Sequence, residues 1–391
     1  MSELDNLKIY GETTVGWCAA TPPNETTDED GRMVVPDVAS GRVDPRAPGS
    51  RRYDDPGVKA LRETFRGKNG MIGLEICEPH EVERATRIFF RDGFVVVNNL
   101  LDPDQLERWR DASARVLRMI LEIKGEGGRK YITESGRLPH RYSYGTASAS
   151  RELLHDPVWA SMVDLPTTTP ILKSIFGGND YFLRGAGGDL CLPGAIEYQG
   201  LHADTRDDFK ITPERLEQAG RVGIRPDKVP GTDELTASTV GLILERTPPH
   251  VTINFLMSDF TWENGPVRQI PGTHGRVPHP PKLPEEPEWM RLSTLVGAKA
   301  GAGVFRDNRA WHGATPNLSK EIRAMPNVEY HAPWVDPSRY WKSMPHEIWE
   351  TLSPHAQHIS RYVKEAPGVW PAGAGVMHPL ANKRKEAKEM A

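Results

Sequence analysis

The run Val251-Thr-Ile-Asn-Phe-Leu-Met257, followed by Asn264-Gly265 and Val267-Arg-Gln-Ile270, decides the fold class of this 391-residue chain. The two outer runs are rich in β-branched and apolar residues, which is typical of strands. An Asn-Gly pair between two strands is a strong hairpin signal. We therefore expect the two runs to pair as a hairpin. Similar short runs broken by Gly and Pro begin near residue 150 and predict an antiparallel β architecture.

Other short apolar runs supply further candidate strands for the same domain, at residues 181–184, 188–192, 303–305 and 328–330. Two facing sheets are the economical arrangement for many short antiparallel strands. We predict a mainly β fold with a double-stranded β-helix (jelly-roll, cupin-like) core and flanking α-helices. Such a core would bring segments that are far apart in sequence to the mouth of one barrel.

Helices are expected before this β region. Residues 81–90 predict one helix, which leads into a strand-like run at 94–97. Asp102 can cap a second helix, because Pro103 suits the first turn and Gln105 stands three residues after the cap. The apolar stripe of this second helix would lie against a sheet until Gly125 ends the run.

The composition along the chain suggests three parts. Residues 1–75 are rich in Pro, Gly, Asp and Arg, and we expect an N-terminal arm or extended wrap. Residues 76–335 would form the jelly-roll domain, with 205–250 as a lid insertion in which Thr212 caps a helix. Residues 336–391 would form a C-terminal helical extension packed on the same domain.

The global composition limits the classes of partner. A net charge of -4 gives no pull toward nucleic acid or an anionic membrane, and no stretch approaches the ~18 apolar residues of a membrane-spanning helix. The N-terminus lacks the basic and apolar regions of a secretory signal, and three widely spaced cysteines argue against a disulfide framework. We expect a cytoplasmic protein, monomeric or homodimeric, that acts on a small molecule.

A split set of metal-binding residue types lies within the predicted β domain: His202 and Asp204, and then His312. The composition makes about two His-x-Asp/Glu matches expected by chance, and His202-Ala-Asp204 is the one that occurs. The tripeptide alone is therefore weak evidence. In a strand, however, residues i and i+2 share a face, so both side chains could bind one ion. Two imidazoles and one carboxylate hold non-haem Fe(II) and leave other positions open.

Four ordered segments carry a more specific resemblance. They are 90–106 (FRDGFVVV through LLDPDQL), 198–204 (YQGLHAD), 262–274 (WENGPVRQIPGTH) and 311–323 (WHGATPNLSKEIR). In this order they resemble the phytanoyl-CoA dioxygenase family of Fe(II)/2-oxoglutarate-dependent oxygenases over roughly residues 85 to 335. The resemblance implies that His202, Asp204 and His312 bind iron. It also implies that Arg323, eleven residues after His312, anchors the cosubstrate.

The resemblance implies a reaction as well. Fe(II), 2-oxoglutarate and O2 would be required, succinate and CO2 would be released, and an unactivated C–H bond of a small organic molecule would be oxidised. Arg323 suits the far carboxylate of 2-oxoglutarate, because its guanidinium is planar, permanently charged and bidentate. Hydroxylation is the default outcome, while desaturation, cyclisation, stereoinversion and bond cleavage remain open.

Asp204 argues against halogenation, since the halogenating relatives of this family carry a small residue at the position of the carboxylate ligand. Two functions of other classes also remain open. A zinc-dependent hydrolase could use the same two histidines and carboxylate, and a non-catalytic jelly-roll binding protein would need no complete set.

Weaker candidates surround these residues. Gln199 could hydrogen-bond near the cosubstrate, and Arg184, Arg141, Tyr142 and Arg206 could contact the substrate. The sequence does not distinguish a free small molecule from a CoA thioester or a carrier-bound substrate. His274 lies in a Pro-Gly turn, to which the resemblance assigns a structural role. We expect His250, His279 and His331 to be ordinary histidines, because no acidic residue stands two positions after any of these three.

Overall fold

The computed structural model describes residues 17, 52–122, 140–144, 153–275, 279–339, 342–369 and 371. The expectations for the rest of the N-terminal arm, for Gly125 and for the chain beyond 371 concern residues outside these ranges. Within the described ranges, no helix combines the length and apolar character that crossing a membrane requires.

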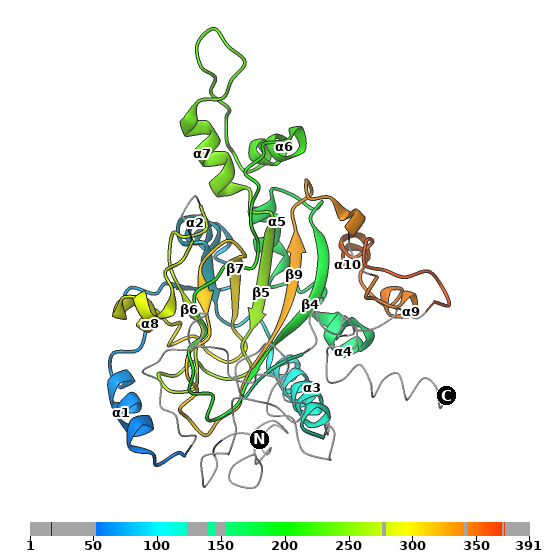
Figure 1. Ribbon diagram of the computed structural model, residues 1–391. Helices are drawn as coiled ribbons and strands as arrows, with labels where there is room; N and C mark the ends of the chain where they lie inside the picture. Colours follow the sequence, from blue (N-terminus) through cyan, green and yellow to red (C-terminus); the bar gives the residue numbers. More distant parts are fainter. Residues whose placement is uncertain are drawn as a thin grey trace.

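A seven-stranded sheet forms the centre of the fold (Figure 1). Its strands, in spatial order, are β1 (Ile76–Cys77), β2 (Phe94–Val97), β7 (Gly303–Asp307), β5 (His250–Phe255), β9 (Arg323–His331), β4 (Phe182–Cys191) and β3 (Arg141–Ser143). Every neighbouring pair is antiparallel except β1 and β2, which are parallel. A smaller two-stranded sheet pairs β6 (Arg268–Gln269) with β8 (His312–Gly313). This two-sheet arrangement confirms the predicted jelly-roll core.

The two faces of the large sheet differ in polarity. Successive side chains of a strand point to opposite faces, so Ile253, Phe305 and Val328 lie on one face, inside the main hydrophobic core. Their neighbours along the strands include Thr252, which pairs in register with both Arg306 and Glu329. One face of the sheet is therefore apolar, and the other carries buried polar and charged side chains.

Helices cover the apolar face. The core there includes residues of α2 (Val82–Asp92), α3 (Pro103–Glu122), α4 (Pro157–Ala160), α5 (Thr169–Phe176) and α10 (Pro354–Ile359). The predicted capping box of α3 is present: the Gln105 backbone N–H donates to the Asp102 carboxylate at 2.7 Å, and Gln105 Oε1 accepts from the Asp102 N–H at 3.0 Å. The predicted flanking helices thus pack against the apolar face of the sheet and leave its polar face toward the smaller layer.

The smaller layer faces the polar side of the large sheet. Residues 199–202 pair alongside β8 in this layer. Gln199 N donates to Ala314 O at 3.0 Å, and His202 forms an isolated bridge with His312. Side chains of the large sheet reach this layer directly. Arg141 Nη2, for example, donates to the backbone oxygens of Glu197 and Thr315 at 2.8 and 2.9 Å. Polar groups therefore line part of the space between the two layers, beside an apolar cluster that includes Phe94, Val304 and Met325.

The insertion at 205–250 forms two helices, α6 (Pro213–Arg221) and α7 (Ala237–Arg246), which project beyond one end of the sheet (Figure 1). Thr212 caps α6 as predicted, with its hydroxyl accepting from the Arg215 N–H. The two helices share a small core of their own that includes Ala219, Ile224 and Ile243. A separate core of this kind predicts that the insertion packs as a unit.

Both ends of the insertion are attached to one residue, Asn308, which follows β7. Asn308 O accepts from the Asp204 and Thr205 N–H groups at 2.9 and 3.1 Å, and Asn308 N donates to His250 O at 3.0 Å. A buried charge network adds to this attachment. Arg215 and Arg309 both donate to Asp207, whose side chain is 1% exposed, and Arg309 also binds Asp307. The insertion is thus connected to the strand that leads to His312.

The expected hairpin at Asn264-Gly265 is wrong. Strand β5 has β7 on one edge and β9 on the other, so it has no free edge for β6, which lies in the other sheet. The Asn264-Gly265 turn instead connects the two layers, and Asn264 forms a bridge with Asn317. Gly265 does adopt the left-handed conformation, with a φ of 74°.

Part of the predicted arm is also helical, since α1 (Pro56–Phe65) begins after an Asp55 cap. Two short helices lie elsewhere, at α8 (Glu288–Leu292) and α9 (His346–Trp349). The 3₁₀ turns are η3 (Leu153–His155), η4 (Ser161–Val163), η5 (Leu283–Glu285) and η6 (Pro337–Arg339).

Candidate functional site

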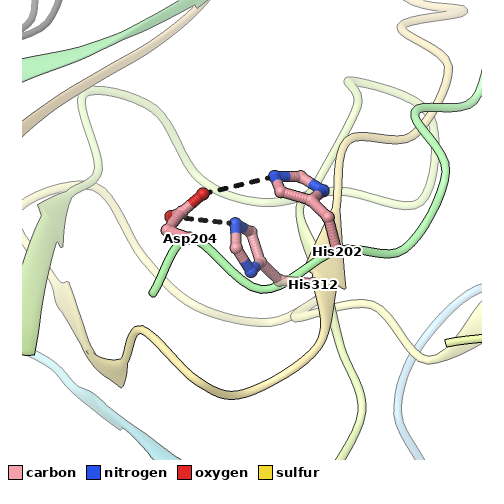
Figure 2. A group of neighbouring side chains, drawn as sticks. All are labelled: His202, Asp204 and His312. Carbon is pink, nitrogen blue, oxygen red and sulfur yellow. Dashed lines mark ion pairs between the residues drawn. The ribbon is translucent and has the colours of Figure 1, made fainter. Parts of the chain in front are cut away.

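His202, Asp204 and His312 come together between the two layers (Figure 2). His202 Nε2 lies 3.4 Å from Asp204 Oδ1, and His312 Nε2 lies 3.3 Å from Asp204 Oδ2. Ligand atoms that share one ion at about 2.1 Å are about 3 Å apart when their bonds are perpendicular, so these spacings suit a single metal ion. Among the described residues, each of the three offers one ligand atom within 4.8 Å of the others.

Backbone pairing sets this arrangement. His202 N donates to His312 O at 3.1 Å and His312 N donates to His202 O at 3.0 Å, which brings the two rings to a centroid distance of 4.3 Å. Asp204 lies in the bend after this bridge, where its N–H donates to Asn308 O. The His-x-Asp spacing predicted that His202 and Asp204 lie on one regular strand. The structure instead places Asp204 where the chain leaves the strand pairing.

Each histidine ring is oriented by a carbonyl two residues before it. His202 Nδ1 lies 3.1 Å from Gly200 O, and His312 Nδ1 lies 3.1 Å from Ala310 O. A carbonyl only accepts hydrogen bonds, so this contact favours a proton on Nδ1 and leaves the lone pair on Nε2. Metal-binding histidines are commonly oriented in this way.

The charge states suit a metal as well. Burial lowers the pKa of His312 to about 4, and the neighbouring Arg306 guanidinium acts in the same direction. Desolvation alone would raise the pKa of Asp204, but His312 and Arg306 together hold it well below its usual range. At neutral pH His312 is therefore neutral and Asp204 is charged, which are the forms that bind a metal ion.

Sequence reasoning missed Arg306, on β7. Its Nη2 donates to Asp204 Oδ2 at 2.8 Å, and its Nη1 lies 3.0 Å from His312 Nδ1. The signal was available in Gly303-Val-Phe-Arg-Asp307, because an arginine inside an otherwise strand-like run, six residues before His312, requires a partner when it is buried.

Arg323, at the start of β9, is 1% exposed. Its Nε donates to Gly265 O at 3.2 Å, while its buried Nη1 has no hydrogen-bond partner among the described residues. A buried guanidinium with an unsatisfied donor is costly unless an anion or water completes it. This position therefore fits one end of an anionic ligand.

Arg141 lies in the same row as Arg323, because Cys191 pairs in register with both residues. Burial lowers the pKa of Arg141, and the charge on Arg323 acts in the same direction. Arg141 Nη1 also contacts Cys191 Sγ at 3.0 Å, beside its two backbone bonds to the smaller layer. The structure thus places this candidate substrate residue in the same row as Arg323, with Cys191 of β4 between them.

The other weak candidates lie in different environments. The Gln199 side chain accepts a hydrogen bond from Ala314 N at 3.2 Å, within the small layer. Arg184 forms an ion pair with Glu329, and Arg206 is exposed after the triad. Tyr142 is fully buried in the main core on the helix-covered face, because it alternates with Arg141 along β3. The structure therefore does not bring Tyr142 to the triad.

Two histidines expected to be ordinary belong to a buried polar group near the triad. His250 Nε2 lies 3.7 Å from the Glu329 carboxylate, and its ring centroid is 4.4 Å from that of His331. Burial lowers the pKa of His250 well below its ordinary value, and burial raises the pKa of Glu329. His274, by contrast, contacts Phe90 O and lies under Gly93, in agreement with a structural role.

Comparison with known proteins gives a family match. The family described as "Phytanoyl-CoA dioxygenase (PhyH)" matches residues 234–325, a segment that contains His312 and Arg323. "Dioxygenase andF" of Emericella variicolor is 30% identical over 136 residues, which cover 33% of this chain and 46% of that protein. The chain therefore aligns with less than half the length of this curated relative. The match confirms the family resemblance for the segments 262–274 and 311–323, which lie inside residues 234–325.

Several solved structures are also similar. AviO1 from Streptomyces viridochromogenes is 17% identical, with a TM-score of 0.41 and coverage of 66% of this chain and 97% of that chain. HygX from Streptomyces hygroscopicus, solved with nickel, 2-oxoglutarate and hygromycin B bound, is 16% identical, with a TM-score of 0.41 and coverage of 64% and 87%. The carbocyclase SnoK from nogalamycin biosynthesis is 18% identical, with a TM-score of 0.41 and coverage of 70% and 92%.

Proposed function

Starting from the match of residues 234–325 to the phytanoyl-CoA dioxygenase family, we propose that this chain is an Fe(II)- and 2-oxoglutarate-dependent dioxygenase that hydroxylates a small organic molecule. The convergence of His202, Asp204 and His312 carries the proposal. The buried, incompletely satisfied guanidinium of Arg323 supports it from the other end of the site.

In this proposal the two Nε2 atoms and the Asp204 carboxylate hold the metal. With iron and 2-oxoglutarate bound, the site would supply oxidative decarboxylation of the cosubstrate to succinate and CO2, coupled to oxidation of a C–H bond. Gly200 O and Ala310 O keep the two histidine rings in the tautomer that binds metal. Three protein ligands leave positions open for the cosubstrate and O2.

Arg323 is proposed to hold the far carboxylate of 2-oxoglutarate. Its Nη1 is the donor that lacks a partner among the described residues, so an incoming carboxylate would complete its hydrogen bonding. Arg141 lies in the same row and adds a second positive charge there. The Gln199 amide oxygen accepts from Ala314 N, which leaves the amide N–H2 group of Gln199 to donate to the cosubstrate.

Asp204 fills the carboxylate position of the triad, so we propose hydroxylation and not halogenation. Desaturation, cyclisation, stereoinversion and bond cleavage use the same residues and remain alternatives. We also propose that the 205–250 insertion is a lid that contributes to substrate choice, since it begins at Asp204 and ends at the strand that carries His250. A cytoplasmic location, a monomeric or homodimeric state and the three-part division of the chain remain predictions.

Anaerobic titration tests the proposal. Fe(II) and then 2-oxoglutarate are added to the wild type, to His312→Ala and to Arg323→Gln, and the visible charge-transfer absorption is recorded. We expect the wild type to develop a weak band, His312→Ala to lose iron, and Arg323→Gln to retain iron but bind 2-oxoglutarate weakly. Arg87, exposed on α2, supplies an Arg87→Gln control.

Two results would contradict the proposal. The first is a folded, iron-loaded wild type without the absorption band. The second is a His312→Ala variant that keeps both its iron and its succinate production. Metal analysis with oxygen-consumption measurements separates a zinc hydrolase, which would bind zinc and consume no O2. A screen of small molecules for stimulated succinate release then addresses the substrate.

A further inference from the structure

Arg306 faces the triad from the opposite layer. It lies on β7 in register with Thr252 of β5 and Phe94 of β2, and its side chain is 6% exposed. Its charge is only partly matched, because Asp204 is the one carboxylate within ion-pair distance of Arg306 among the described residues. That carboxylate is also the proposed metal ligand.

The three nitrogens of Arg306 have unequal partners. Nη2 has a good acceptor in Asp204 Oδ2, at 2.8 Å. Nε is buried and has no hydrogen-bond partner among the described residues. Nη1 lies 3.0 Å from His312 Nδ1, and Nδ1 in turn lies 3.1 Å from Ala310 O.

The contact between Arg306 Nη1 and His312 Nδ1 conflicts with metal binding. A guanidinium only donates and a carbonyl only accepts, so Nδ1 can satisfy Arg306 or Ala310 but not both. When His312 binds a metal through Nε2, its ring proton is on Nδ1 and is directed to Ala310 O. Nη1 then faces an N–H group and loses its acceptor. In the metal-bound protein, two buried groups of Arg306, Nε and Nη1, therefore have no acceptor among the described residues.

We propose that Arg306 binds a carboxylate next to the metal, and that this is the carboxylate of the cosubstrate's 2-oxo acid end. The inference rests on the proposed function and deepens it, since Arg323 and Arg306 would then hold opposite ends of one dicarboxylate. A carboxylate supplies several lone pairs and matches a guanidinium in shape and charge. Nε and Nη1 donate on different edges of the guanidinium, so the carboxylate would satisfy one of these two groups while Nη2 remains on Asp204.

Charge supports this assignment. A divalent ion and Asp204 sum to one positive charge, and Arg306 raises the local sum to two before any anion is bound. A buried site with two uncompensated positive charges is unfavourable, so Arg306 favours an anion at the metal over a neutral ligand. The charge of Asp204 is already balanced by the divalent ion, so Asp204 by itself does not require Arg306 as an additional cation.

Paired ligands test the proposal without turnover. The protein is loaded with Mn(II) under nitrogen, and binding of 2-oxoglutarate and of 2-oxobutyrate is measured by calorimetry. 2-Oxobutyrate has the 2-oxo acid end but lacks the far carboxylate. We expect Arg306→Gln to weaken both ligands by about 10- to 100-fold, since a charge-assisted hydrogen bond is lost in each case. Arg323→Gln should weaken 2-oxoglutarate only.

Controls separate binding from folding. Arg306→Lys keeps the charge but loses the fork of donors, so it should recover part of the affinity for both ligands. Arg87→Gln should bind both ligands like the wild type. Thermal unfolding of each variant, and the Mn(II) content by electron paramagnetic resonance, verify that the folded, metal-loaded state is compared.

Two outcomes would overturn the inference. One is an Arg306→Gln variant that, at saturating Mn(II), binds both ligands with wild-type affinity; Arg306 would then only position Asp204. The other is weakening of 2-oxoglutarate without weakening of 2-oxobutyrate. Failure of the proposed function is distinct, because the wild type itself would then bind neither Mn(II) nor 2-oxoglutarate.

Discussion

Replacing Asp207 with Asn should destabilise the protein far more than the same change at the adjacent Asp208. The two carboxylates are matched locally, since each accepts the backbone N–H two residues further on, at 2.9 and 3.1 Å. They differ in burial. Asp207 has a 1% exposed side chain between Arg215 and Arg309, whereas Asp208 is 58% exposed and pairs with Lys210, which is 77% exposed.

The magnitude follows from this difference. In the wild type, Arg215 and Arg309 are balanced by Asp207 and Asp307, so Asp207→Asn leaves one buried positive charge without a counterion. Removing one partner of a buried ion pair costs about 3–5 kcal/mol. This is a large part of the free energy of unfolding of a typical folded protein, which is about 5–15 kcal/mol. Asp208→Asn removes an exposed pair and should cost less than about 1 kcal/mol.

Urea unfolding followed by circular dichroism measures both free energies of unfolding. Hydrogen exchange adds a local measurement, and we expect Asp207→Asn to increase exchange in α6. Iron affinity should fall in the same variant, because Asp207 follows Asp204 by three residues and Arg309 precedes His312 by three. Equal free energies of unfolding for the two variants, within about 1 kcal/mol, would refute the reasoning that the buried network holds the insertion in place.

Two further predictions concern pH and a sheet glycine. Burial, with Arg184 nearby, lowers the pKa of His331 to about 3, so the unfolded chain binds this proton first as the pH falls below about 6.5. The contribution of neutral His331 to the free energy of unfolding is therefore complete above about pH 6.5. About 2 kcal/mol of the free energy of unfolding should be lost by pH 5 in metal-free protein. Urea unfolding above pH 6.5 and at pH 5 measures this loss. The loss in free energy of unfolding should be smaller in His331→Gln than in the wild type, and unchanged in the exposed control His80→Gln. Equal losses in the wild type and both variants would contradict the assignment to His331. A Cβ at Gly188, whose φ is 139°, would lie 2.4 Å from Met325 O, so Gly188→Ala should cost at least about 2 kcal/mol in thermal unfolding. Gly220→Ala, on α6 with no atom within 4 Å of the added Cβ, should be neutral or stabilising, and similar losses for the two changes would exclude the steric reason.

Local signals in the sequence predicted the helices well. The Asp102–Gln105 capping box and the Thr212 cap depend on residues within three positions of one another, so the sequence contains all the information that they need. The jelly-roll class was also predictable, because it depends on the number and spacing of short strands.

Strand pairing was harder to predict, for a physical reason. Asn264-Gly265 predicted a local hairpin, but β5 pairs with β7 and β9, which lie further along the chain. Edge occupancy is a property of the whole sheet and is not encoded in the turn. The 182–191 strand was similarly predicted as two pieces, and the structure joins them through an irregularity between Leu183 and Gly185.

The residues of the candidate site show the same difference between local motifs and strand pairing. His202, Asp204, His312 and Arg323 could be named from motif order, and their identification as ligands stays a prediction. For Arg306 the sequence shows only an arginine within a strand-like run, because its partners Asp204 and His312 come from the register of β7 against the opposite layer. Tyr142 lies in the main core for the related reason that one step along β3 changes the face to which a side chain points, and its predicted contact with the substrate stays a prediction.

The attachment of both ends of the 205–250 insertion to Asn308 has a consequence for how such a protein can diversify. Because the entry and exit of the insertion are held at one backbone position, its ends stay a fixed distance apart whatever lies between them. Doubling a flexible loop adds only about 0.6 kcal/mol of closure cost, so length here is inexpensive. If the insertion is the proposed lid, substrate range can therefore evolve by exchange of a self-packed segment, while the residues proposed to hold metal and cosubstrate are inherited unchanged.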